Sequence, residues 1–162
     1  MKEKIVNIDG KNYRCDEDRV SLDETYLQMA ELWGTCRSYG IRAKVGTLIV
    51  MPGIGIISDG YNGMPVGEPN YLMEIQADDG SWYTNPEAIH AESNALLKLT
   101  QRTEVCTGAT MYQTFSPCSG CVKLIKQARI ARIVFREYFR DTVGLPSLLK
   151  AGIELVHLKR KP

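Results

Sequence analysis

The chain lacks a long apolar run, a large excess of charge of either sign and an even set of cysteines. No apolar stretch approaches the ~18 residues of a membrane-spanning helix. Its 20 Lys and Arg residues nearly balance 19 Asp and Glu residues, giving a formal net charge of +1. That balance is not typical of a protein that binds long nucleic acids by contacting many phosphates. Five cysteines are an odd number, and the polar start Met1-Lys2-Glu3-Lys4 is no secretory leader. We therefore expect a soluble protein of the reducing cytoplasm.

At 162 residues the chain is long enough for one domain with a single core. Residues 1–20 are expected to form an appended hairpin around the turn dipeptide Asp9-Gly10, and residues 21–162 the main domain. Periodicity predicts helices at 22–39, 90–100, 118–128 and 143–151, and strands at 45–51, 55–59, 109–114, 131–135 and 153–158. This order predicts a three-layer α/β/α sandwich with a five-stranded mixed sheet. Residues 60–86 are polar and predict a long loop of a kind that is usually functional or disordered.

Two short motifs carry recognisable chemistry: His90-Ala91-Glu92 and Pro117-Cys118-Ser119-Gly120-Cys121. One imidazole and two thiolates can hold zinc tetrahedrally and leave a fourth position to water, whose pKa then falls toward ~7. Glu92 remains free for proton transfer. The combination H-x-E and P-C-x-x-C resembles the signature of zinc-dependent nucleobase deaminases.

Helix geometry restricts where these residues can sit. Residues two apart inside a helix point roughly 200° apart around its axis, so His90 and Glu92 reach one metal only if the helix begins at about His90. Cys118 and Cys121 are three apart, on one face of a helix whose start is marked by Ser116-Pro117. The positive end of that helix dipole favours thiolates.

A structural zinc ribbon and a redox pair are the alternative interpretations of the C-x-x-C motif. A ribbon needs a second close pair of ligands, whereas Cys15, Cys36 and Cys106 lie far apart in the sequence. A redox pair would leave His90 and Glu92 without a role. The four residues together therefore favour a catalytic zinc site.

Over about residues 24–158 the sequence resembles the cytidine deaminase superfamily, and more narrowly the deoxycytidylate (dCMP) deaminases. Besides the zinc motifs, the resemblance rests on Arg37-Ser38, Arg42, Val45-Gly46, the run GYNGMPVG from Gly60 to Gly67, Asn94-Ala95 and Gln127-Ala128. It implies hydrolytic deamination of dCMP to dUMP and ammonia, supplying dUMP for thymidylate synthesis. In this family's pattern His90, Cys118 and Cys121 match the ligands of one catalytic zinc, and Glu92 matches the proton shuttle.

The resemblance also implies further contacts and partners. Asn62 and Ala91 match substrate-binding positions, although Asn62 alone could be a turn residue. A homo-oligomer, often a hexamer, is expected, activated by dCTP and inhibited by dTTP, with Mg²⁺ accompanying a triphosphate effector. The effector is expected near Gly60, Asn62 and Gly63.

A nucleotide substrate needs hydrogen-bond donors for its phosphate oxygens. Residues 37–44 offer Arg37, Ser38 and Arg42. Tyr138 and Arg140 are further candidates. The alternative is a solvated, positively charged helix end, which complements the helix dipole. The resemblance favours phosphate contact for some of these residues.

The sequence also departs from the family's pattern. Some dCMP deaminases hold a second, structural zinc near the long loop. Here Glu68-Pro69-Asn70 stands where a Cys or His would be needed, so we expect one zinc. Thr47 stands where Ala is usual and Arg129 where Gly is usual, which keeps dCTP, 5-modified dCMP and free deoxycytidine open as alternative substrates. A nucleic-acid-binding or nucleic-acid-editing zinc protein is the alternative of another class, disfavoured by the neutral charge and by few aromatic residues among basic ones.

Overall fold

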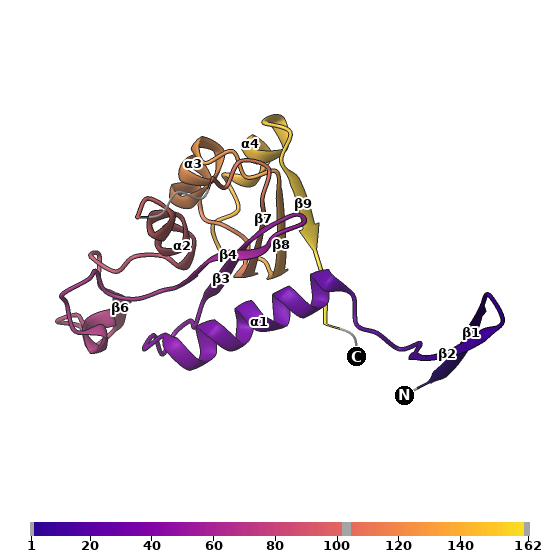
Figure 1. The fold of residues 1–162 in the computed structure, drawn as a ribbon. Coiled ribbons are helices and arrows are strands. Elements are labelled where there is room, and N and C mark those ends of the chain that lie inside the picture. Colours follow the sequence, from indigo (N-terminus) through magenta and orange to yellow (C-terminus); the bar gives the residue numbers. More distant parts are fainter. Residues whose placement is uncertain (1, 102–104, 161–162) are drawn as a thin grey trace.

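A computed structural model describes residues 2–101 and 105–160 of the chain, and Figure 1 shows their arrangement. The helices are α1 (Leu22–Arg37), the 3₁₀ helix η1 (Asn70–Met73), α2 (Ala91–Leu99), α3 (Ser119–Gln127) and α4 (Leu145–Lys150). The strands are β1 (Glu3–Ile8), β2 (Lys11–Asp16), β3 (Gly46–Met51), β4 (Gly55–Tyr61), β5 (Glu74–Gln76), β6 (Trp82–Thr84), β7 (Thr110–Phe115), β8 (Arg132–Glu137) and β9 (Glu154–His157). Within the described ranges, no helix has the length and apolar character needed to cross a bilayer.

The central sheet has five strands in the order β4-β3-β7-β8-β9. Strand β3 is antiparallel to both β4 and β7, whereas β7, β8 and β9 run parallel to one another. Helix α1 covers one face of the sheet, and α2, α3 and α4 cover the other (Figure 1). The predicted three-layer α/β/α sandwich with a five-stranded mixed sheet is therefore confirmed.

Both faces of the sheet are buried, which explains why its inner strands read as continuous apolar runs. In β3, Leu48 and Val50 pack with Leu27 of α1, whereas Ile49 between them belongs to the core under α2, α3 and α4. Successive residues of a strand face opposite sides, so one strand supplies two cores. Each fully buried side chain of this size contributes about 1.5–3 kcal/mol.

The helix boundaries follow the predicted ones closely, although each of the four α-helices is two or three residues shorter than predicted. The hydroxyl of Ser21 caps α1 by accepting the backbone N–H of Glu24 at 3.2 Å, as the Ser-x-x-Glu spacing indicates. Helix α1 ends at Arg37 instead of residue 39, because Ser38 is extended and its hydroxyl accepts the N–H of Gly40. Helix α4 covers only part of residues 143–151.

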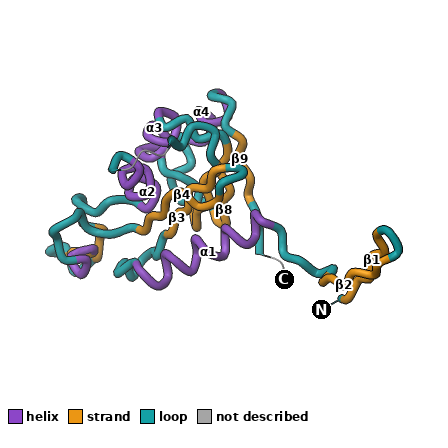
Figure 2. The backbone as a smooth tube through the Cα atoms, in the orientation of Figure 1, coloured by secondary structure: helices purple, strands orange, loops and turns teal. Residues whose placement is uncertain are grey.

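Strands β1 and β2 form the predicted hairpin, which stands apart from the sandwich at one end of the molecule (Figures 1 and 2). Its turn has positive φ at Asp9 and Gly10, as two-residue hairpin turns require. The register pairs Val6 with Tyr13 and Ile8 with Lys11. Val6, Ile8 and Tyr13 therefore lie on one face together with Lys11, and Ile8 and Tyr13 are more than half exposed.

The polar segment 60–86 is partly ordered, in contrast to the long loop that its composition predicts. Helix η1 leads into β5, which pairs with β6 in a small antiparallel hairpin. We refer to residues 70–84 as the flap. The flap lies at the end of the molecule opposite the β1–β2 hairpin (Figure 1).

Candidate active site

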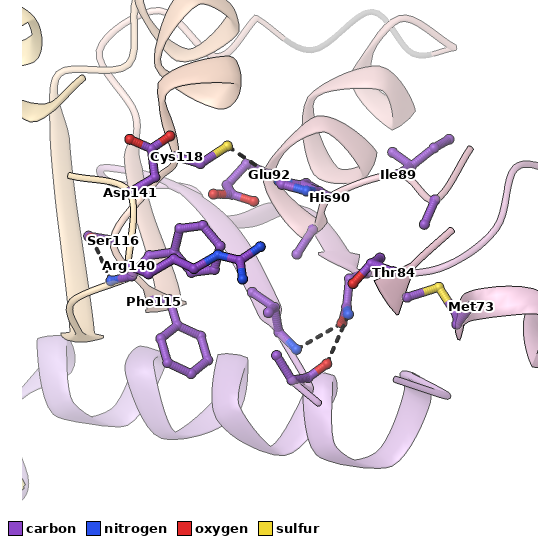
Figure 3. A pocket seen from close by; sticks show the side chains of 16 residues that line it. Met73, Thr84, Ile89, His90, Glu92, Phe115, Ser116, Cys118, Arg140 and Asp141 are labelled. Atoms are coloured by element: carbon purple, nitrogen blue, oxygen red, sulfur yellow. Dashed lines mark hydrogen bonds between the residues drawn. The ribbon is translucent and has the colours of Figure 1, made fainter. Parts of the chain in front are cut away.

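The two sequence motifs meet at the N-termini of α2 and α3. His90 is the N-cap of α2, Cys118 is the N-cap of α3, and Cys121 lies in the first turn of α3. The Nδ1 atom of His90 lies 3.5 Å from the Sγ atoms of both Cys118 and Cys121. A tetrahedral zinc about 2.3 Å from sulfur and about 2.0 Å from nitrogen would separate two such ligand atoms by about 3.5 Å. The donor set and its spacing therefore fit Zn²⁺, and Figure 3 shows His90 and Cys118 side by side.

Neighbouring groups orient these ligands. The Ser93 hydroxyl on α2 lies 3.8 Å from the Cys121 sulfur on α3. Asp141 accepts hydrogen bonds from the backbone N–H and the hydroxyl of Ser119, at 2.9 and 2.8 Å, and so caps α3 beside Cys118. The Ser119 amide lowers the pKa of the Asp141 carboxyl. The Cys121 thiol and the His90 imidazole lower the pKa of the Cys118 thiol, which favours the thiolate that a metal needs.

Glu92 lies at the base of a cavity of about 350 Å³ that also includes His90 and Cys118. Its side chain is only 5% exposed, and burial raises the pKa of its carboxyl. A carboxyl group with a raised pKa can both accept and release a proton near neutral pH. Figure 3 shows Glu92 between His90 and Cys118, facing the same space.

The cavity continues outward into a second space of about 260 Å³. The two share Asn62, Met73, Phe115 and Arg140, and we call the whole the cleft. Phe115 and Phe139 form one wall in an edge-to-face pair with centroids 6.4 Å apart. Arg42, Glu74 and Tyr138 line only the outer space, and Arg140 lines both spaces. The cleft therefore runs from the metal-ligating cluster to a group of charged side chains.

Asn62 and Ala91, both predicted to contact substrate, line the inner cavity. The side-chain oxygen of Asn62 accepts the N–H of Val45 at 2.8 Å, and its NH₂ group donates to the carbonyl of Ala43 at 3.0 Å. Asn62 thus fixes the backbone of Ala43 and Val45, which line the same cavity. Its direct contact with substrate stays a prediction.

Gly60 and Gly63, predicted near an effector, are instead tightly packed inside the protein. A side chain at Gly60 would collide with the backbone of Ala91 and Ala95 in α2, and one at Gly63 with Asn70. Close approach of neighbouring groups explains these glycines without a ligand.

The predicted phosphate residues are divided between two places. Arg42 and Tyr138 line the outer cleft, whereas Arg37 and Ser38 do not. The Arg37 guanidinium lies 5.9 Å from the ring centroid of Trp33 and 5.8 Å from that of Tyr61, facing another depression. Ser38 is buried, with its hydroxyl bound to the amide of Gly40. We therefore leave Arg37 and Ser38 out of the candidate phosphate site.

Sequence reasoning missed several residues of the site. Asp141 reaches Ser119 across 22 residues of sequence, a distance at which no local pattern signals a helix cap. Met73, Glu74 and Thr84 enter the cleft from the flap, whose short strands were not predicted. Arg140 was not missed, since the sequence analysis names it as a candidate phosphate contact, and it lines both spaces of the cleft.

Comparison with known proteins places most of the chain in one family of sequences. Residues 20–137 match the model of the cytidine and deoxycytidylate deaminase zinc-binding region. The β1–β2 hairpin lies outside this match.

Several relatives and solved structures are similar to the chain. Deoxycytidylate deaminase of Enterobacteria phage T4 is 32% identical over 157 residues, covering 73% of this chain and 80% of that protein. Probable deoxycytidylate deaminase of Caenorhabditis elegans is 27% identical, and the match covers 82% of this chain and 66% of the worm protein. The crystal structure of dCMP deaminase from cyanophage S-TIM5 in complex with dCMP and dUMP is 37% identical, with a TM-score of 0.75 over 86% of this chain and 96% of that chain.

Proposed function

The chain belongs to the cytidine and deoxycytidylate deaminase family, and we propose that it hydrolyses dCMP to dUMP and ammonia. One observation carries the proposal. A cleft joins three metal-ligating side chains and the buried Glu92 at its inner end to Arg42 at its outer end, and Arg140 lines both parts. A pyrimidine with a phosphate on its sugar is a ligand that needs both ends.

His90, Cys118 and Cys121 would hold Zn²⁺, which when bound supplies a water nucleophile of lowered pKa. Glu92 accepts a proton from the attacking water and passes it to N3 of the ring. It then takes the proton of the new C4 hydroxyl and delivers it to the departing amino group. The net change is replacement of the C4 amino group by oxygen, with ammonia as leaving group. Burial of Glu92 excludes bulk water and raises the pKa of its carboxyl, which suits both steps.

The outer cleft supplies the phosphate contacts. Arg42 and Arg140 offer planar guanidinium groups and Tyr138 a hydroxyl donor, all suited to phosphate oxygens. In Figure 3 the Arg140 side chain extends into the cavity below Glu92. Arg42 is fixed by donating from Nη1 to the carbonyl of Trp82 at 3.0 Å.

The test is ammonia release by the purified, zinc-loaded protein with dCMP, 5-methyl-dCMP, dCTP, deoxycytidine and single-stranded DNA. We expect dCMP to have the highest kcat/KM. A preference for dCTP or 5-methyl-dCMP would keep the chemistry and correct the substrate. Activity on single-stranded DNA alone would contradict the proposal.

We also infer a regulated homo-oligomer of the hexameric kind that the family resemblance implies. The exposed side chains of Ile8 and Tyr13, on the same face of the hairpin as Val6, support self-association. A depression of about 690 Å³ lined by Arg37, Lys44 and Tyr61 supports a nearby site for dCTP or dTTP, with Mg²⁺ on the triphosphate. Light scattering tests the oligomer, and assays with each effector test the regulation.

Free thiols at Cys15 and Cys36 support our proposal that the protein works in a reducing cytoplasm.

A further inference from the structure

Glu74 is the acidic side chain among the described residues that line the outer cleft. It comes from the start of β5 in the flap, and it lines a space to which Arg42, Tyr138 and Arg140 also contribute. A carboxylate at this end is unexpected, because the same end has to receive the negatively charged phosphate of the proposed substrate.

Hydrogen bonds hold the Glu74 carboxylate in one place. Its Oε1 atom accepts the backbone N–H of Ile41 at 2.7 Å and that of Arg42 at 2.8 Å. Consecutive backbone N–H groups that converge on one point form an anion-binding site in many proteins. Here the anion is the protein's own carboxylate, so neither amide is free to bind a phosphate oxygen.

The flap is held to the same segment from its second strand. The carbonyl of Trp82 in β6 accepts a hydrogen bond from Nη1 of Arg42. Because β5 pairs with β6, Glu74 and Trp82 together hold residues 41 and 42 against the flap. The negative charge of Glu74 is therefore a fixed part of the wall.

We propose that Glu74 is a specificity-determining residue that restricts the cleft to nucleotides with a single phosphate. The inference rests on the proposed function. It adds how the cleft selects among nucleotides with one, two or three phosphates. Arg42 and Arg140 can balance one phosphate. A second phosphate would extend toward the Glu74 carboxylate, and like charges at short range repel each other. The two amides that could have bound the second phosphate are already occupied.

Glu74→Gln separates charge from hydrogen bonding, because the amide oxygen of Gln can still accept both N–H groups. We expect kcat/KM for dCDP relative to dCMP to rise by about tenfold or more in this variant. Glu74→Ala removes the acceptor as well, so it should raise KM for dCMP by freeing the flap. Glu87→Gln, an exposed change outside the cleft, is the matched control.

Binding of dCMP and dCDP by calorimetry gives a second readout that needs no turnover. A higher relative affinity for dCDP in Glu74→Gln than in the wild type supports the proposal. An unchanged dCDP-to-dCMP ratio, in both affinity and kcat/KM where turnover is present, overturns the role of Glu74. Absence of turnover with every nucleotide in the wild type contradicts the proposed function instead, and the affinity ratio still decides the role of Glu74.

Discussion

Thr47 and Gln113 are fully buried polar side chains without a hydrogen-bond partner among residues 2–101 and 105–160. They are cross-strand neighbours in β3 and β7, on the face that α2 and α3 cover. Leaving a buried donor or acceptor unpaired costs about 1–3 kcal/mol. The two unpaired polar side chains therefore form one local feature between β3 and β7.

Replacing Gln113 by Met keeps a similar shape and removes the buried amide. We expect Gln113→Met to increase the free energy of unfolding by about 1–3 kcal/mol, measured by urea denaturation. The exposed change Gln101→Met should alter it by less than about 0.5 kcal/mol. A loss of stability in Gln113→Met would instead mean that the amide has a partner, such as an internal water.

Single residues also show where sequence reasoning succeeds and fails. Helix arithmetic placed His90 at a helix start, because a metal restricts which positions can converge, and Ser116-Pro117 marked the start of the helix that begins at Cys118. Arg37 could not be placed in this way. Its packing on Trp33 and Tyr61 depends on how α1 meets β4, which is a tertiary contact with no local pattern.

At the scale of elements, the helices and strands of the sandwich were predictable because each has a sustained apolar pattern. The flap was not, since β5 and β6 have three residues each, too few for a period to show. This failure had a functional consequence, because Met73, Glu74 and Thr84 reach the cleft only through the flap.

The β1–β2 hairpin is the element that we expect the sandwich not to need for folding. Both strands are exposed along almost their whole length, and their residues take no part in the two core clusters. Removing residues 1–20 should therefore change the free energy of unfolding by less than about 0.5 kcal/mol. Cooperative urea unfolding of both forms at low protein concentration measures this. A much less stable shortened protein would show that the hairpin contributes to the folded domain.

At the scale of the whole molecule, Arg136 joins elements from both ends of the sequence. Its side chain in β8 is 1% exposed and pairs with Glu24 and Glu31 of α1 at 2.7 and 3.2 Å. It also donates to the carbonyl of Leu158 near the end of the described chain. A cation buried at this depth is compensated only if all these partners are present.

Removing Arg136 should therefore be far more damaging than removing an exposed partner of the same glutamate. We expect Arg136→Met to lower the free energy of unfolding by about 3–5 kcal/mol. Arg160 also pairs with Glu31, at 2.9 Å, but is 73% exposed, so Arg160→Met should cost less than about 1 kcal/mol. Equal losses in the two variants, compared by urea unfolding, would contradict this account of the buried pair.

Asp23 joins α1 to the sheet and makes stability depend on acid pH. It accepts two hydrogen bonds from Arg132 at 2.8 and 2.7 Å and one from the Tyr112 hydroxyl at 2.8 Å. The Arg132 guanidinium lowers the pKa of the Asp23 carboxyl. The stabilisation is therefore present above the carboxyl's unfolded pKa of about 3.9 and is lost as pH falls through the lower folded value.

Asp23→Asn should remove that part of the pH dependence. We expect the variant to be less stable at neutral pH, and the gap to the wild type to narrow below about pH 4. Thermal unfolding across acid pH measures the gap, with the exposed change Asp78→Asn as control. A gap that is constant with pH would show that charge on Asp23 is not what stabilises this contact.

The central claim is that Glu92 moves the proton at a zinc site made by His90, Cys118 and Cys121. The most direct measurement is zinc content and dCMP deamination in the same preparations of wild-type, Glu92→Gln and His90→Ala protein. We predict full zinc in Glu92→Gln with turnover reduced by about 10²–10⁴-fold, and reduced zinc in His90→Ala. Normal turnover by a zinc-loaded Glu92→Gln enzyme, or full zinc in His90→Ala, would contradict the account.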